Sequence, residues 1–418
     1  MSSIKKQTII YYLVLYVALL FTWARQDYIP MPARIAYLVL VFAPVLFKRV
    51  SFYFPCLVLY LTTSLLSYAG YTFMPTETSI YLLFTLIFAF ASHRGERKSY
   101  YPYIIFLCIL ILITSVNLFC SLKIEKVTYS FLILLLLPLT IKGKERETVV
   151  ELVPKVFIVS TLACAVLTLF NQQLLIQQSS AYDRLVSGSL NYTCCTLGIG
   201  FILALREFMK QSTHKIGKLF YALSMMLLII TIVLEASRGA VLAVAVSTVL
   251  IIFKQQSRIG TKIVTIILAS LMVLVLYNNQ FLDLLIYRIQ SETGTGTGRT
   301  EIWSNKLHLF LEQSSVSSLL FGIGYDKAWN LGGAGLSFIG CHNDYLAFFI
   351  EYGFVGVLLF LVLVFYPLRA AKSRIVRIDV LPFVSYIIIV CMTLEPFSMG
   401  YLPFCFFLFF IYLRSCEQ

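Results

Sequence analysis

The chain has 418 residues, of which 59% are hydrophobic and only 13% are charged, so it is not an ordinary soluble domain, in which about 25% of residues are charged. The mean hydropathy of +0.86 and continuous apolar runs such as YSFLILLLLPLTI predict an α-helical membrane protein. A transmembrane β-barrel would instead show alternating segments of about 10 residues. The net charge of +13 has to be judged by where the charges lie.

Apolar runs recur along the whole chain, and we expect a polytopic, all-α transmembrane bundle. About 12–14 runs are expected to cross the membrane, since a span needs roughly 20 apolar residues and several of the runs are short. No small-residue cleavage site follows the first run, which is therefore predicted to be an anchor helix. In chain order the runs are Thr8–Trp23, Ile35–Phe47, Pro55–Phe73, Ser79–Ser92, Tyr101–Cys120, Val127–Ile141, Val149–Phe170, Thr193–Leu205, Leu219–Leu234, Ala240–Phe253, Ile263–Tyr277, Tyr345–Leu368, Val380–Leu394 and Tyr401–Leu413.

Most Lys and Arg residues fall in alternate loops between these runs, beginning with Lys5 and Lys6. This is the positive-inside pattern, and it predicts that both termini are cytoplasmic. The basic charge is then a signal of topology, so nucleic acid is not an expected partner. The polar stretch 278–344 falls on the opposite side of the membrane.

This stretch is predicted to be one long extracytoplasmic loop that contains short helices and carries the chemistry. It divides the chain into N-terminal transmembrane helices (1–277), the catalytic loop (278–344) and C-terminal transmembrane helices (345–418). Within the loop, IWSNKLHLFLEQ has the apolar spacing of an amphipathic helix that could lie along the outer leaflet.

Several glycines lie at the end of the loop and in the apolar run that follows it. Gly322 and Gly324 are predicted to be turns with positive φ, and we expect the same of the loop glycines that follow them. Gly353 and Gly356 are interpreted as a helix-packing pair. The last of the loop glycines are Gly332, Gly333 and Gly335.

Two arginines next to span ends on the outer face are candidates for binding phosphate. Arginine suits that group because its planar fork donates two hydrogen bonds and stays charged. Arg184 lies in AYDRLVSGSLNYT, and Arg238 lies in the short turn EASRGA. The alternatives are a salt bridge between Arg184 and Asp183, and a snorkelling Arg238 paired with Glu235. Arg299, further along the chain, is more simply interpreted as an exposed loop residue.

His342 ends the long loop and is the candidate general base. An imidazole with a pKa near 6.5 can accept a proton from a hydroxyl group at neutral pH. Asn343 and Asp344 beside it are possible supporting residues, and the alternative is a structural histidine that caps a helix. No second histidine or carboxylate cluster has ligand spacing, so neither a metal nor another cofactor is expected.

Together these motifs resemble the O-antigen ligase and O-antigen polymerase superfamily of bacterial membrane glycosyltransferases. The similar parts are FGIGYD, His342-Asn343 with the glycines of EYGFVG, and the SRGA turn. Arg184 followed by Asn191 and GRTEIW at Arg299 are also similar, although Leu190 stands where the family usually has proline.

The resemblance implies a metal-independent, inverting transfer from an undecaprenyl-pyrophosphate-linked glycan. Arg184 and Arg238 would hold the pyrophosphate, His342 would activate the acceptor hydroxyl, and Asn191 and Arg299 would support them. The resemblance places the protein in the bacterial inner membrane with its active site on the extracytoplasmic face. A chain-length regulator is considered as a further partner.

Polymerase and ligase both remain open. From Asn278 to Cys341 four Lys or Arg stand against five Asp or Glu. This near-neutral loop favours a polymerase, whose acceptor is another lipid-linked repeat unit, over a ligase, whose acceptor is the phosphorylated lipid A–core. A flippase of lipid-linked sugar is the alternative from another class, but we find neither repeat symmetry nor more charge within the spans than Lys155.

Overall fold

The computed structural model confirms the all-α class, and the only strands among the residues it describes form one short hairpin. It divides into two compact units, each built from separate stretches of the chain. The residues described are 31–46, 143–170, 176–179, 182–185, 190–210, 213–254, 257–278, 299–324, 327–331, 340–370 and 374–394, with a few positions near 10–15 and 280–286.

Unit 1 comprises Met1–Gly95, Leu136–Glu235 and Ser257–Val275. Three of its helices, α7, α9 and α10, pack against one another. A Cβ at Gly200 would overlap the Thr161 side chain, so glycine permits the close approach of α9 to α7. The elements are α2 (Met31–Leu46), α7 (Gly143–Phe170), the antiparallel strands β1 (Ile176–Ser179) and β2 (Tyr182–Leu185), α9 (Leu190–Met209), α10 (Lys215–Leu234) and α12 (Ile259–Asn278), whose last residues fall in unit 2.

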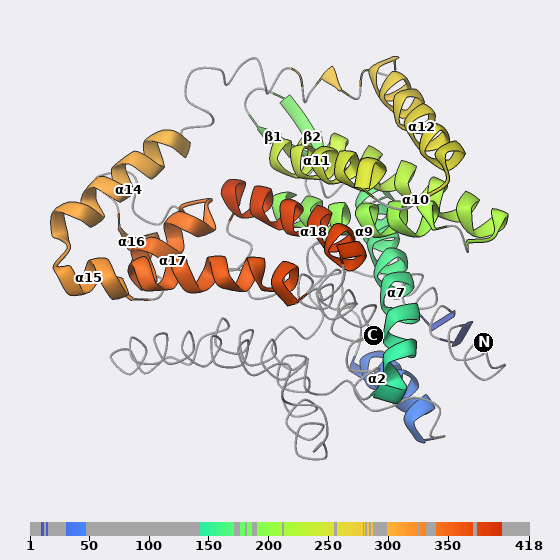
Figure 1. Ribbon diagram of the computed structural model, residues 1–418, viewed down its shortest axis with the longest axis horizontal. Coiled ribbons are helices and arrows are strands. Elements are labelled where there is room, and N and C mark those ends of the chain that lie inside the picture. The colour runs from blue at the N-terminus through green and yellow to red at the C-terminus, as the bar shows by residue number, and fades with distance from the viewer. Residues whose placement is uncertain are drawn as a thin grey trace. The chain divides into compact units, whose positions relative to one another are not determined.

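Unit 2 comprises Glu96–Leu135, Ala236–Gln256 and Leu276–Gln418. Figure 1 shows α14, α15 and α16 beside α17, and α11 beside α18. Two contacts show that α11 and α18 are antiparallel: Gly239 packs on Thr393, and the Ser247 hydroxyl donates to the carbonyl of Pro382 at 2.8 Å. The elements are α11 (Arg238–Lys254), α14 (Arg299–Gln313), α15 (Val316–Phe321), α16 (Lys327–Asn330), α17 (Asp344–Ala370) and α18 (Arg374–Thr393).

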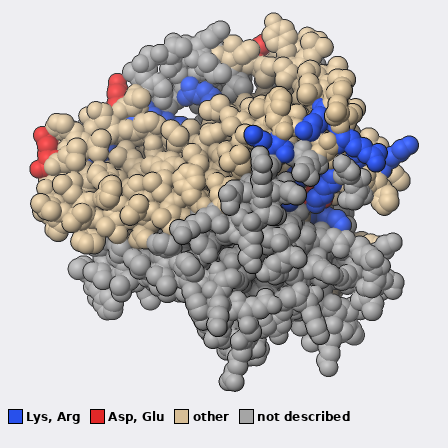
Figure 2. Space-filling model, in the orientation of Figure 1, with Lys and Arg blue, Asp and Glu red and all other residues tan. Residues whose placement is uncertain are grey.

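Apolar side chains cover much of the helices' surface, as a lipid-exposed protein requires. Helix α12 is apolar almost all round, and most of its side chains are exposed, including Ile267 and Leu274. Most of the described surface in Figure 2 is neither acidic nor basic. By length and composition, three described stretches can cross a membrane: α10, α12 and Asp344–Val362.

Eight of the predicted spans coincide with helices, from Ile35–Phe47 on α2 to Val380–Leu394 on α18. Lys155, the charge predicted within a span, lies on α7. The total of 12–14 spans and the three-part division stay predictions. The remaining predicted spans lie wholly or almost wholly outside the described residues: Thr8–Trp23, Pro55–Phe73, Ser79–Ser92, Tyr101–Cys120, Val127–Ile141 and Tyr401–Leu413.

The predicted span Tyr345–Leu368 is not one straight helix, because α17 breaks at Gly353 (φ 68°, ψ −165°). The rings of Phe348 and Phe360 stack with centroids 4.6 Å apart, whereas twelve residues of straight helix would separate them by roughly 18 Å. The first half of α17 therefore folds back on the second. A Cβ at Gly356 would overlap Tyr352, so Gly356 has the packing role expected of it.

The break at Gly353 interlocks with the FGIGYD turn. Gly322 and Gly324 have φ of 80° and 108°, which confirms the predicted positive φ. A Cβ at Gly322 would overlap the backbone of Glu351, and a Cβ at Gly353 would overlap the backbone of Leu320. The interrupted helix leaves two carbonyls for the turn: Ile323 N–H donates to Ile350 at 3.0 Å, and Gly324 N–H donates to Glu351 at 3.1 Å. The predicted turns at Gly332, Gly333 and Gly335 lie outside the described residues.

Replacing Gly353 by alanine should destabilise unit 2. A left-handed φ costs a residue with a Cβ about 1–2 kcal/mol and overpacking costs about 1–3 kcal/mol, so we expect a loss on the order of 2–4 kcal/mol. Gly260→Ala is the matched control, because no atom lies within 4 Å of its added Cβ. Thermal unfolding in detergent should show a lower midpoint for Gly353→Ala and a change within about 1 kcal/mol for Gly260→Ala. Equal midpoints would contradict the interlock.

Candidate active site

Three helices of unit 2 begin at the C-terminal end of α18. The guanidinium of Arg299, the first residue of α14, donates from Nη1 to the Thr393 carbonyl at 2.9 Å. The backbone N–H of Asp344, the first residue of α17, donates to the Leu394 carbonyl at 3.1 Å. At the start of α11, a Cβ on Gly239 would overlap the Thr393 side chain. The starts of α11, α14 and α17 therefore meet at Thr393 and Leu394.

This meeting point favours an anion. A helix N-terminus carries roughly +0.5 of a charge and unpaired backbone N–H donors. Arg238 and Arg299 add two full positive charges as the first residues of α11 and α14. The C-terminus of α18 and the buried Asp344 oppose this positive charge. Arginines and helix N-termini commonly bind phosphate-bearing ligands in proteins.

His342 is held at this point by contacts on both sides of it. Trp303 donates from Nε1 to the Cys341 carbonyl at 2.6 Å. Asn343 caps α17, since its Oδ1 accepts the Leu346 N–H at 3.2 Å. His342 itself has φ 51°, in the left-handed region that few residues with a side chain adopt. Residues held in such conformations cluster at functional sites.

The environment of His342 favours the neutral form of its imidazole. Burial is the main reason that the pKa of His342 lies below its ordinary value of 6.5, and the nearby charges of Arg299 and Lys306 lower it further. The side chain is only partly buried. A neutral, accessible imidazole is the form that can accept a proton.

One face of α14 makes most of the contacts that shape the loop. Arg299, Trp303, Lys306 and Phe310 follow one another at spacings of four, three and four residues, so they share a face. The ammonium of Lys306, fully buried, donates to the carbonyls of Ala328 and of Leu331, the latter at 2.7 Å. The predicted helix is present, but its largest contact face lies against protein.

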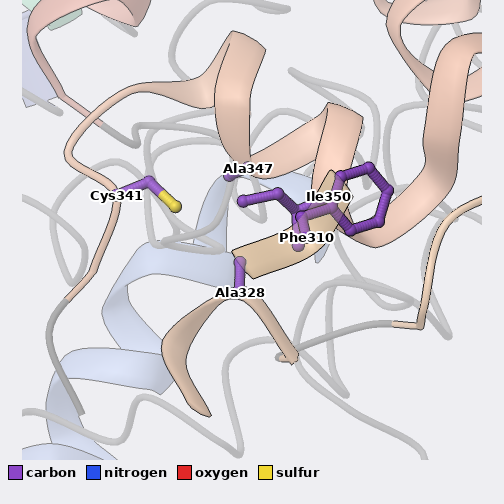
Figure 3. Packing of buried hydrophobic residues seen from close by; sticks show 5 residues of the cluster. All are labelled: Phe310, Ala328, Cys341, Ala347 and Ile350. Carbon is purple, nitrogen blue, oxygen red and sulfur yellow. The ribbon is translucent and has the colours of Figure 1, made fainter. Parts of the chain in front are cut away.

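Phe310 belongs to the apolar core of the loop. Figure 3 shows how Phe310 packs with side chains from α16, α17 and the segment that joins them. This core cluster extends across the predicted border between the loop and the C-terminal helices at residues 344 and 345. It consists of Phe310, Ala328, Cys341, Ala347 and Ile350.

The predicted site residues are divided between the two units. Arg238, Arg299, His342, Asn343 and Asp344 lie in unit 2 around the end of α18. In unit 1, Arg184 lies on β2 opposite Gln177, and Asn191 is the second residue of α9. Glu235, considered above as a partner of Arg238, is fully buried in unit 1, where its Oε2 accepts a hydrogen bond from the Cys194 thiol at 2.7 Å.

Sequence reasoning missed Trp303, Lys306 and Thr393. The spacing of the first two from Arg299 was a usable signal, because it places polar donors on one face of a predicted helix. Thr393 lies in an apolar run and offered no signal. Among the described residues, no group of three or more His, Cys, Asp or Glu side chains could hold a metal ion.

The fold and the site thus define a helical membrane protein in which three helix starts, two of them at arginines, meet near His342. Residues 223–361 match a family model described as O-antigen ligase. The matched segment contains Arg238, Arg299 and His342, and it confirms the resemblance to the O-antigen ligase and polymerase superfamily. It supports a glycosyltransferase-like function of the ligase or polymerase type. Arg184 and Asn191 precede the segment, and no curated protein matches the chain.

Removing the buried lysine should weaken the loop. Lys306→Ala leaves two carbonyls without their donor and opens a cavity, so we expect a loss on the order of 2–4 kcal/mol. Lys327→Ala removes an exposed lysine from the neighbouring α16 and should change stability by no more than about 0.5 kcal/mol. Limited proteolysis between residues 299 and 340 reports on this region, and equal cleavage of the two variants would show that Lys306 is not structural.

Proposed function

We propose that the protein is a membrane glycosyltransferase that polymerises undecaprenyl-pyrophosphate-linked oligosaccharide repeat units into a surface polysaccharide. The observation that supports this proposal most directly is the meeting of three helix N-termini at the end of α18. Two of these helices begin with Arg238 and Arg299, and His342 lies just before the third. The proposal places the enzyme in the bacterial inner membrane, with both termini cytoplasmic and the active site extracytoplasmic. Its partners are the lipid-linked donor, a glycan acceptor and the bilayer, and a chain-length regulator is a further candidate.

The first part of the mechanism is the binding of the donor's pyrophosphate at the end of α18. The starts of α11 and α14 bring Arg238 and Arg299 to this end, and both stay charged near a membrane. Negative charge grows on the leaving pyrophosphate as the glycosyl bond breaks, and preformed positive charge stabilises it in the transition state. The family resemblance assigns Arg184 the same role and makes Asn191 a supporting residue.

The second part is activation of the acceptor. The neutral His342 takes the proton of an acceptor hydroxyl as its oxygen forms a bond to the anomeric carbon of the donor sugar. The bond between that carbon and the pyrophosphate oxygen breaks in the same displacement, which inverts the configuration. Charge stabilisation comes from the arginines in this scheme, so the step proceeds without a metal ion.

Asn343 and Asp344 support the base through the backbone. The Asn343 side chain caps α17, and the Asp344 N–H ties the same turn to α18. These contacts make them positioning residues.

An O-antigen ligase is the second candidate, because the matched family model carries that description. A ligase transfers the finished glycan to the phosphorylated lipid A–core, which a basic outer surface would attract. The loop from Asn278 to Cys341 instead has four basic residues against five acidic ones. This balance favours the polymerase.

A complementation assay separates the two activities and tests His342. In a host strain that lacks the protein, wild type should restore a ladder of glycan lengths, whereas His342→Ala should slow extension on the order of 10²–10⁴-fold and leave single repeats. His308→Ala is the control, because that side chain is 70% exposed and pairs only with Glu312 among the described residues. Full-length glycan that stays on the lipid carrier in the deletion strain would establish the ligase. Full complementation by His342→Ala would refute its role as the base.

The pH dependence of extension should reflect the lowered pKa of His342. A base works in its neutral form, and this form persists below pH 6.5 when the folded-state pKa is depressed. The acidic limb of the rate profile should therefore have its midpoint below pH 6.5. Arg299→Gln removes a neighbouring charge, so its acidic limb should move to higher pH. Initial rates with purified enzyme test both statements, and an unmoved limb would contradict the electrostatic link.

A further inference from the structure

Helix α15 exposes apolar side chains from a segment that lies outside the predicted spans. Val316 is 75% exposed, and Leu320, one helical turn further on, and Phe321 are also exposed. Leu319 of the same helix is partly buried and packs on the core cluster of the loop. The helix is thus attached to the protein through Leu319, and three of its large apolar side chains stay exposed.

The exposed apolar residues of α15 adjoin an exposed apolar part of α17. The backbone at Leu320 and Phe321 touches Gly353, where α17 breaks. The next residue, Phe354, is 61% exposed, and Leu358 one turn later is 53% exposed. One apolar surface therefore continues from α15 onto the second half of α17.

The second half of α17 is nearly as long as a membrane is thick. Phe354–Ala370 has 17 residues and is about 25 Å long, slightly less than a hydrocarbon core of about 30 Å. The apolar stretch Asp344–Val362 is not one straight span, because the chain folds back at Gly353. For the second half to cross the membrane its whole length is needed, and Gly353 is then at one end of the crossing. The backbone contact brings α15 to the same level.

The sequence around α15 suits this level. No residue from Gln313 to Gly324 is charged, and three of the first five are the serines Ser314, Ser315 and Ser317. On α14 the pair His308–Glu312 is well exposed and polar. Charge thus stops before α15 begins, so this segment has no charged side chain that would have to enter the bilayer.

We propose that α15 is an interfacial membrane anchor: Val316, Leu320 and Phe321 insert among the lipids of the leaflet next to the loop. The anchor fixes the height of the loop, and through the interlocked Gly322 and Gly353 it ties that height to the end of the α17 crossing. The occupant of this surface is lipid acyl chain. The anchor does not depend on the proposed enzymatic function.

Accessibility of introduced thiols in nanodiscs, which expose both membrane faces, tests the anchor. The full-length variants are Val316→Cys and Phe321→Cys, with Glu312→Cys as the control on the exposed polar side of α14. Labelling by a membrane-impermeant maleimide is measured against the unsubstituted chain, which corrects for native cysteines. We expect both α15 positions to react at least ten times more slowly than the control.

A second measurement identifies what covers the surface. A bimane fluorophore attached at the same positions in detergent is reconstituted with lipids brominated in their acyl chains. Emission from Val316→Cys and Phe321→Cys should be quenched, and emission from Glu312→Cys should not. Labelling as fast as the control would overturn the proposal by showing a water-exposed surface. Slow labelling without quenching would overturn it by showing that protein covers α15.

Discussion

The carbonyl groups at the C-terminal end of α18 are the constraint on which the candidate site depends. The last carbonyls of a helix have no partner within it and must find donors elsewhere. Here Thr393 receives the guanidinium of Arg299, and Leu394 receives the backbone N–H of Asp344, itself a donor that α17 cannot satisfy internally. The carbonyls at the end of α18 thus accept one hydrogen bond from the start of α14 and one from the start of α17. The geometry that results puts two arginines and a histidine at one place.

Side chains on one face of α14 hold the loop in place, as the end of α18 holds the starts of the helices. Trp303 binds the carbonyl next to His342, and Lys306 binds two carbonyls around α16. A buried lysine is costly unless its donors are used, so the ammonium fixes the course of the loop around it. The same charge helps to keep His342 neutral. Lys306 thus contributes both to the course of the loop and to the lowered pKa of His342.

The sequence predicted the helical class, the positive-φ glycines and the residues with chemical signatures, such as Arg238, Arg299 and His342. It could not predict Thr393, because every residue carries a carbonyl and the choice of one acceptor is made by the fold. The break in α17 was missed for a related reason. Both lipid and a protein core select apolar side chains. A continuous apolar run therefore cannot show which of its halves packs on protein and which faces lipid. The break depends on α15, about thirty residues earlier.

That break decides where the candidate base can act. As a straight helix, Asp344–Ala370 would be roughly 40 Å long and would carry His342 beyond a hydrocarbon core of about 30 Å. Folding at Gly353 returns the start of α17 to the end of α18, where Asp344 binds Leu394 and the Tyr345 hydroxyl reaches the Ile388 carbonyl at 3.4 Å. A reacting group that is attached to a lipid cannot move far from the membrane. An enzyme that acts on such a group therefore needs its base close to the ends of its membrane helices. The interlocked glycines meet that need by holding the fold-back in place.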